Sequence, residues 1–198
     1  MESPFPDVPA APRPLLSCGP DVPPRLTART LDGLEWLLAR ELVSLGATDL
    51  RMGRRTIEFS GSTETLYRAV LESRVAIRIL EPLGRFAVSS PESLYSSISS
   101  VDWAKHLRPN QTLRVDARVH DSFIDHSLYA SQVVKDAVVD GVRAVHGRRP
   151  NVQLHGASLR LSLHLSGETA TLFRDAAGQS LHQRGWRQGR VELSLIHI

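Results

Sequence analysis

The 198-residue sequence is poor in cysteine, in lysine and in long apolar runs. Its one cysteine, Cys18, excludes an internal disulfide framework and any metal site built from several thiolates. No stretch approaches the roughly 20 consecutive apolar residues that a membrane-spanning helix needs. We therefore expect a cytoplasmic protein without a membrane segment.

The motifs of the common catalytic and nucleotide-binding sites are missing as well. No Gly-x-Gly pattern and no P-loop lysine motif occur, which argues against a glycine-rich loop for a dinucleotide or S-adenosylmethionine. No histidine pair has zinc-binding spacing, and no Gly-x-Ser-x-Gly elbow is present. Asp136 and Asp140 stand four residues apart, but such a pair is more often a solvated helix face. We expect no catalytic residue, no cofactor and no metal in this chain.

Proline is concentrated at one end of the chain. The first 25 residues hold eight of the twelve prolines and no apolar run. A secretory signal would need an apolar central segment. The composition predicts a disordered, proline-rich leader over residues 1–25.

The positive charge is concentrated at the other end. Residues 143–198 hold eight basic and three acidic residues, whereas residues 1–142 hold 16 basic and 18 acidic residues. A basic C-terminal third predicts a polyanionic partner. Only two of the 24 basic residues are lysines, and arginine suits bidentate contact with phosphate.

The first half of the chain predicts a β-α-β-β-α-β order. Residues 31–45 form a helix in this interpretation, with Thr30 as its cap, Gly46 as its stop and an apolar face made of Leu34, Leu37, Leu38, Leu42 and Leu45. Strands are expected at 26–30, 48–52 and 55–59, followed by a helix from Ser62 to Ser73 with Leu66, Val70 and Leu71 facing inward. Residues 75–88 return to extended structure, broken at Pro82 and Gly84. This order describes a ferredoxin-like domain, which we place at 26–90.

The second half is organised around a long helix at 126–145. Its apolar face has the helical spacing of Val134, Ala137, Val138, Gly141, Val142 and Val145. Gly147 is the expected stop. A short helix at 92–100, a turn at 103–107 and strands at 113–119, 159–165 and 168–174 surround it. The whole chain is expected to have an α+β fold.

Arginines and aromatic residues alternate near the ends of these elements. Such a composition is typical of an RNA-binding surface, where cations neutralise phosphates and bases stack. The alternative is that the tryptophan is part of the core and the arginines are solvated. Our candidate RNA-binding residues are Lys135, Arg148, Arg149, Arg184, Trp186 and Arg187.

Five segments together resemble a known family. In chain order they are residues 30–47, 73–80, 126–140, 149–152 and 181–187. They resemble the N-terminal half of the bacterial large-subunit ribosomal RNA guanine-N2-methyltransferases that carry a THUMP domain. The resemblance implies a ferredoxin-like domain followed by a THUMP RNA-binding domain, placed here at 91–187. It also implies structured ribosomal RNA, not DNA, as partner, and S-adenosylmethionine as methyl donor for a separate catalytic domain.

The chain departs from this family after Arg187. Residues 188–198 fit neither the family nor a packed element, and we expect them to reflect a truncated or frame-shifted gene. The catalytic domain is then missing from this chain. Two alternatives remain open: a stand-alone module that binds RNA or docks an acidic protein, and the THUMP part of a different RNA-modifying enzyme, such as a uridine thiolation enzyme.

Overall fold

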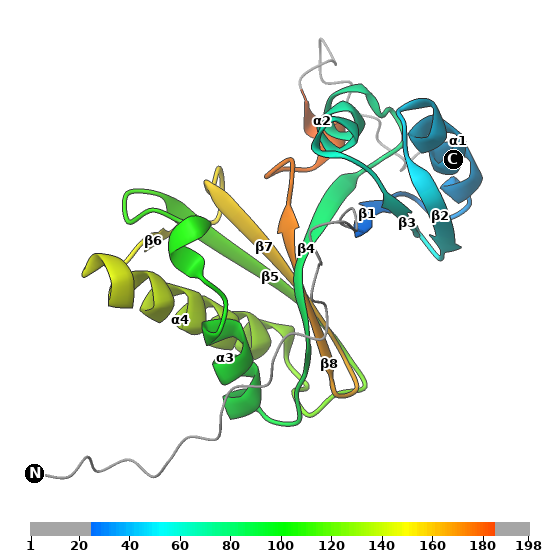
Figure 1. Cartoon of the computed structure of the whole chain (residues 1–198). Coiled ribbons are helices and arrows are strands. Elements are labelled where there is room, and N and C mark those ends of the chain that lie inside the picture. The colour runs from blue at the N-terminus through cyan, green and yellow to red at the C-terminus, as the bar shows by residue number, and fades with distance from the viewer. Residues whose placement is uncertain (1–24, 185–198) are drawn as a thin grey trace, which may run out of the picture.

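A computed structural model of the chain describes residues 25–184 (Figure 1). Residues 1–24 of the predicted leader, Trp186, Arg187 and the tail lie outside the described residues, whereas Arg25, which the leader was expected to include, is the first residue of β1. The helices are α1 (Glu35–Ser44), α2 (Thr63–Glu72), α3 (Pro91–Ser99) and α4 (Ser127–His146), with short 3₁₀ turns at Trp103–Lys105 and Leu181–Gln183. The strands are β1 (Arg25–Arg29), β2 (Thr48–Gly53), β3 (Thr56–Ser60), β4 (Arg78–Ala87), β5 (Thr112–His120), β6 (Asn151–Val152), β7 (Leu159–Ser166) and β8 (Thr169–Asp175).

The described strands form one mixed sheet in the order β2-β3-β1-β4-β8-β7-β5-β6. Strand β4 is the link between its two halves. The first three residues of β4, Arg78 to Leu80, pair with β1, whereas Leu80 to Ala87 pair with β8. In Figure 1, β4 is the long strand that passes from the unit containing α1 and α2 to the unit containing α3 and α4.

The first unit confirms the predicted β-α-β-β-α-β order of a ferredoxin-like domain. Its core is a cluster of buried side chains that includes Leu38, Leu42, Phe59 and Ile79. The second helix begins where Ser62 predicted it: the Ser62 hydroxyl accepts a hydrogen bond from the Thr65 backbone N–H at 3.2 Å. The α+β class is confirmed.

The second unit packs α3 and α4 on one face of β5, β7 and β8. Trp103 is 1% exposed at the centre of its core, and its indole N–H donates to the Ile98 carbonyl at 2.8 Å. The predicted apolar face of α4 is largely buried, including Val134 and Val138. Gly147 ends the helix with a φ of 69°, the left-handed conformation that favours glycine.

The predicted start of the first helix is wrong. The helix begins at Glu35 rather than at residue 31, because Gly33 adopts a φ of 83° and makes a turn there. Thr30 does not cap the helix. Its hydroxyl donates to the Val75 carbonyl at 3.1 Å and ties β1 to the segment before β4.

Three smaller expectations are also corrected. Leu71 and Val145 are 65% and 64% exposed, so they do not face the core. Strand β4 is not broken at Pro82 and Gly84; its register shifts there and the pairing with β8 continues. The two-residue strand β6 was not predicted, because a pair such as Asn151–Val152 carries no periodic pattern.

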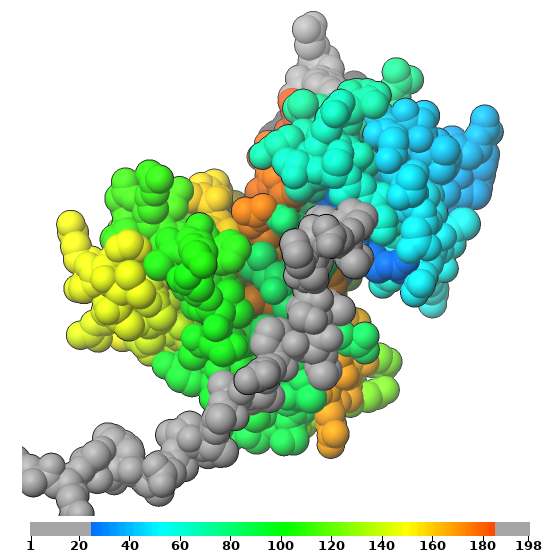
Figure 2. Space-filling view, in the orientation of Figure 1, coloured from blue at the N-terminus to red at the C-terminus, as the bar shows by residue number. Residues whose placement is uncertain are grey.

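All four described helices lie on one face of the sheet. Residues that alternate with the core positions, such as Arg29 on β1, His164 on β7 and Phe173 on β8, point to the opposite face. We call this the open face. Figure 2 shows the two units as separate lobes, with orange residues of the β8 region between them. Of the described helices, none is long and apolar enough to cross a membrane.

Candidate nucleic-acid interface

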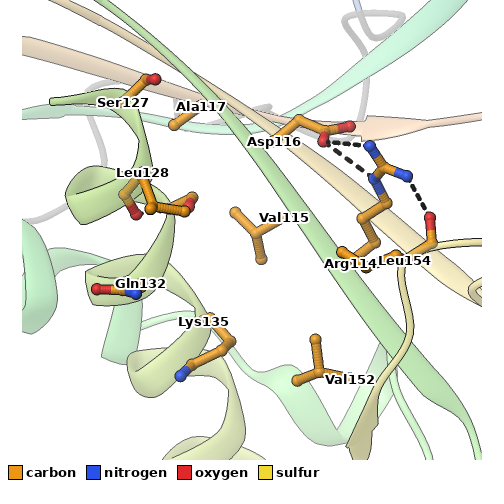
Figure 3. A pocket seen from close by; sticks show the side chains of 11 residues that line it. Arg114, Val115, Asp116, Ala117, Ser127, Leu128, Gln132, Lys135, Val152 and Leu154 are labelled. Carbon is orange, nitrogen blue, oxygen red and sulfur yellow. Dashed lines mark hydrogen bonds and ion pairs between the residues drawn. The ribbon is translucent and has the colours of Figure 1, made fainter.

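A groove runs between the N-terminal half of α4 and the edge of the sheet (Figure 3). Its volume is 440 Å³. Strand β6 pairs with β5 only at Thr112 and Leu113, so the edge of β5 beyond these residues is uncovered. The α4 groove, as we call it, is lined by Arg114, Val115, Asp116, Ala117, Ser127, Leu128, Ser131, Gln132, Lys135, Val152 and Leu154.

The walls of the α4 groove are apolar and its rim is polar. Figure 3 shows Leu128 and Val115 facing each other across the groove, with Gln132 and Lys135 further along the helix. The first turn of α4 has no side-chain cap. Its free N–H groups and the positive end of the helix dipole favour an anion near Ser127.

An arginine–carboxylate cluster closes one side of the groove. The Arg114 Nε donates to Asp116 Oδ1 at 3.0 Å, and the Arg160 Nε donates to Asp116 Oδ2 at 2.7 Å. Arg114 also donates to the Leu154 carbonyl, which holds the segment after β6 against β5. Burial opposes ionisation of Asp116, but the hydrogen bonds from Arg160 and Arg114 outweigh it and lower the pKa of its carboxyl.

The predicted site residues fall in two places. Lys135 lines the α4 groove and forms an ion pair with Asp136 at 2.9 Å. Arg148 and Arg149 are exposed just after α4, and the Arg149 guanidinium pairs with Asp140 at 3.2 Å. Both ion pairs lie at the surface, where such pairs contribute little and exchange readily for another anion. These three cations therefore stay candidates for RNA contact.

Arg184 lies elsewhere, beside the end of α2. Its guanidinium donates to the carbonyls of Leu71, at 2.9 Å, and of Val70 and Ser73. These are carbonyls that a helix end leaves without partners. The structure thus gives Arg184 a role in holding the final 3₁₀ turn against α2, and its contact with RNA stays a prediction.

Residue patterns missed two parts of the site. Ser127, Ser131 and Gln132 carry no motif, and only the packing of α4 against β5 places them in one groove. The sequence shows that Arg114, Asp116 and Arg118 alternate with apolar residues along a strand. This pattern alone does not predict which face of the sheet is left uncovered by helices. Among the described residues, no group of three histidine, cysteine or acidic side chains could hold a metal ion.

Comparison with protein families divides the chain as the two units do. Residues 25–80 match the RlmL ferredoxin-like domain, and residues 88–175 match the THUMP domain. The chain is a THUMP-domain protein. In this THUMP protein the residues between the two matches, 81–87, all belong to β4. The predicted boundary at residue 90 stays a prediction.

Curated relatives of the THUMP protein are much longer than it is. It is 45% identical over 155 residues to the ribosomal RNA large subunit methyltransferase K/L of Methylococcus capsulatus, covering 78% of this chain and 21% of the relative. It is 42% identical over 167 residues to the protein of the same name from Syntrophotalea carbinolica, covering 84% and 23%. The chain thus spans about a fifth of the length of these relatives.

A solved structure has the same fold. A predicted N6-adenine-specific DNA methylase from Listeria monocytogenes superposes with a TM-score of 0.71 at 26% identity. The match covers 84% of this chain and 44% of that one. In each comparison, the matching region is therefore a minor part of a larger protein.

Proposed function

We propose that this chain is the RNA-recognition part of an S-adenosylmethionine-dependent ribosomal RNA guanine-N2-methyltransferase. The observation that carries the proposal is the 45% identity to a ribosomal RNA large subunit methyltransferase K/L, which extends over 155 residues. The likeness to part of a protein described as a predicted DNA methylase, of which the match covers 44%, supports the same proposal. The chain would hold structured ribosomal RNA while another domain performs the transfer.

The lining of the α4 groove does not fit S-adenosylmethionine. The sequence lacks a Gly-x-Gly loop, and the α4 groove offers apolar walls with Lys135 and the Arg114–Asp116 pair at its rim. No step of methyl transfer is assigned to these residues. Their part is to bind and position RNA through phosphate contacts, which set the orientation of the RNA and do not read its sequence.

The surface next to the α4 groove supports a polyanion partner. The first turn of α4 has no side-chain cap, and Lys135, Arg148 and Arg149 lie on the helix or at its exit, where the ion pairs of Lys135 and Arg149 with surface aspartates leave both cations accessible to a phosphate. Arginine forms two parallel hydrogen bonds with a phosphate, which suits a backbone clamp. Each such contact releases counterions, so affinity must fall steeply with salt.

The test is a titration of a large-subunit ribosomal RNA transcript with the purified chain over a range of salt concentrations. Affinity falls with salt, and each lost phosphate contact reduces the magnitude of the slope of log affinity against log salt by about 0.7 to 0.9. We expect Arg148→Gln/Arg149→Gln to reduce this magnitude by about 1.5. Arg40→Gln/Arg108→Gln is the control, because it removes the same charge from two exposed arginines outside the described cavities.

Two results would contradict the proposal. One is the absence of salt-dependent RNA binding by the unmodified chain. The other is binding of polyglutamate, as a mimic of an acidic protein, that is as tight as binding of RNA at equal charge concentration. The second result would instead favour a module that docks an acidic protein.

A further inference from the structure

The open face of the sheet carries a second concentration of arginines, away from α4. Arg29 on β1, Arg78 on β4 and Arg118 on β5 line one hollow of 510 Å³, together with Arg54, Arg55 and His164. We call these six residues the arginine cleft. Glu58 is the acidic side chain in the lining. A smaller hollow of 170 Å³ adjoins it and shares Arg29, Arg78 and Arg118.

The curl of the sheet brings these arginines together. Strands β1 and β5 stand four positions apart in the sheet order. In a flat sheet they would be about 19 Å apart, at roughly 4.8 Å for each step. Instead Arg29 and Arg118 line the same two hollows, so the open face is concave at the point where the two units meet.

The cations of the arginine cleft outnumber their partners. Arg78 pairs with the buried carboxylate of Asp175, and Arg54 reaches Asp32 at 3.5 Å. Within residues 25–184, Arg29, Arg55 and Arg118 have no carboxylate in ion-pair range, and the buried Nε of Arg29 has no hydrogen-bond partner. Burial, then the charges of Arg118 and Arg78, lower the pKa of Arg29 to about 10. Like charges held together in this way would be stabilised by a bound anion.

The arginine cleft is continuous with the α4 groove. The groove and the smaller hollow share Asp116 and Ala117 of β5. The smaller hollow in turn shares three arginines with the larger one. The uncovered edge of β5 therefore connects the helix side of the sheet with the open face, and positive side chains occur at each stage of the path.

We propose that the arginine cleft is a second phosphate-binding site, and that one RNA segment passes from the α4 groove over the free edge of β5 into it. The proposal rests on the proposed function, because it takes RNA as the ligand. A phosphodiester chain carries a charge at every nucleotide, which matches arginines spread over β1, the turn between β2 and β3, β4 and β5. Arginine suits such contacts because its planar guanidinium binds phosphate with two hydrogen bonds.

The decisive variant is Arg55→Gln/Arg118→Gln. Both side chains are exposed and unpaired in the described structure, so their replacement should leave the fold unchanged, which thermal unfolding verifies. We expect the affinity for the large-subunit ribosomal RNA transcript to fall at least about tenfold near 150 mM salt. The magnitude of the slope of log affinity against log salt should fall by about 1.5. Arg40→Gln/Arg108→Gln is the matched control. Arg55→Lys/Arg118→Lys should retain most of the slope, because lysine also neutralises a phosphate.

The outcomes separate the two proposals. If Arg55→Gln/Arg118→Gln behaves like the control while Arg148→Gln/Arg149→Gln weakens binding, the arginine cleft does not contact RNA, and the proposed function stands. If the unmodified chain does not bind the transcript, both proposals fail. A loss that both Arg148→Gln/Arg149→Gln and Arg55→Gln/Arg118→Gln show, that the control does not show, and that lysine at 55 and 118 restores, supports the path over β5.

Discussion

The carboxylate of Glu41 on α1 accepts a hydrogen bond from the Ser73 hydroxyl, at 2.6 Å, at the end of α2. The same carboxylate accepts from the backbone N–H of Arg74, at 2.7 Å, and of Val75, at 3.3 Å. One side chain thus satisfies three donors in the turn that leads from α2 to β4. The two helices of the ferredoxin-like domain are fixed to each other by this contact.

Replacing Glu41 with alanine should lower the free energy of unfolding by about 2 kcal/mol, because charge-assisted hydrogen bonds are lost. Urea unfolding measures the loss. Glu72→Ala is the control, because it removes an exposed i, i+4 ion pair with Arg68, worth at most about 0.5 kcal/mol. Equal losses for both variants would show that the Glu41 contacts contribute nothing special.

Gly141→Ala should also destabilise the protein, although alanine favours a helix by about 1 kcal/mol. A Cβ at Gly141 would lie 2.8 Å from Cδ1 of Trp103, whose indole is buried and held by its hydrogen bond to Ile98. Overpacking of this kind costs about 1 to 3 kcal/mol. We expect a lower melting temperature. A matched control is Ala144→Gly on the exposed face of α4, which tests helix propensity alone.

Asp116→Asn should lower stability and strengthen RNA binding. The change leaves Arg114 and Arg160 without their shared carboxylate, which costs about 1 to 2 kcal/mol for a partly exposed cluster. It also removes a negative charge between the α4 groove and the arginine cleft. Asp125→Asn removes the same charge from an exposed position and controls for net charge. Weaker RNA binding by Asp116→Asn at equal folded fraction would contradict the placement of RNA at this edge.

Stability should fall as the pH drops below about 6.5, in part because of His164. Partial desolvation on the open face, where the side chain still keeps some exposure, and then the charges of Arg29 and Arg118 lower the pKa of His164 below its usual 6.5. At a pH between the pKa of His164 in the unfolded chain, about 6.5, and its lower pKa in the folded chain, the unfolded chain takes up a proton that the folded chain does not. Acidification therefore favours unfolding. His164→Gln should flatten the dependence of the urea midpoint on pH between 7.5 and 5.5. His155→Gln, which removes an exposed imidazole outside the arginine cleft, is the control.

Sequence patterns predicted the elements better than the site. The spacing of Val134, Ala137 and Val138, with Gly147 behind them, indicated α4 and its stop, because helical period and a left-handed stop are local properties. The start of α1 was missed because a turn at Gly33 and a long-range bond from Thr30 overrode the local signal. The arginine cleft could not be predicted, since the curl of the sheet depends on pairing between distant strands.

Strand β4 limits how this protein can be divided. The seven residues between the two family matches lie inside it, and its two ends are paired with different partners, β1 and β8. A cut at residue 80 or 88 would leave one half with an exposed strand edge, which is a template for aggregation. We therefore expect the ferredoxin-like and THUMP parts to fold together. An expression plasmid or a gene fusion should carry the whole of residues 25–175 if either part is to be obtained in its folded form.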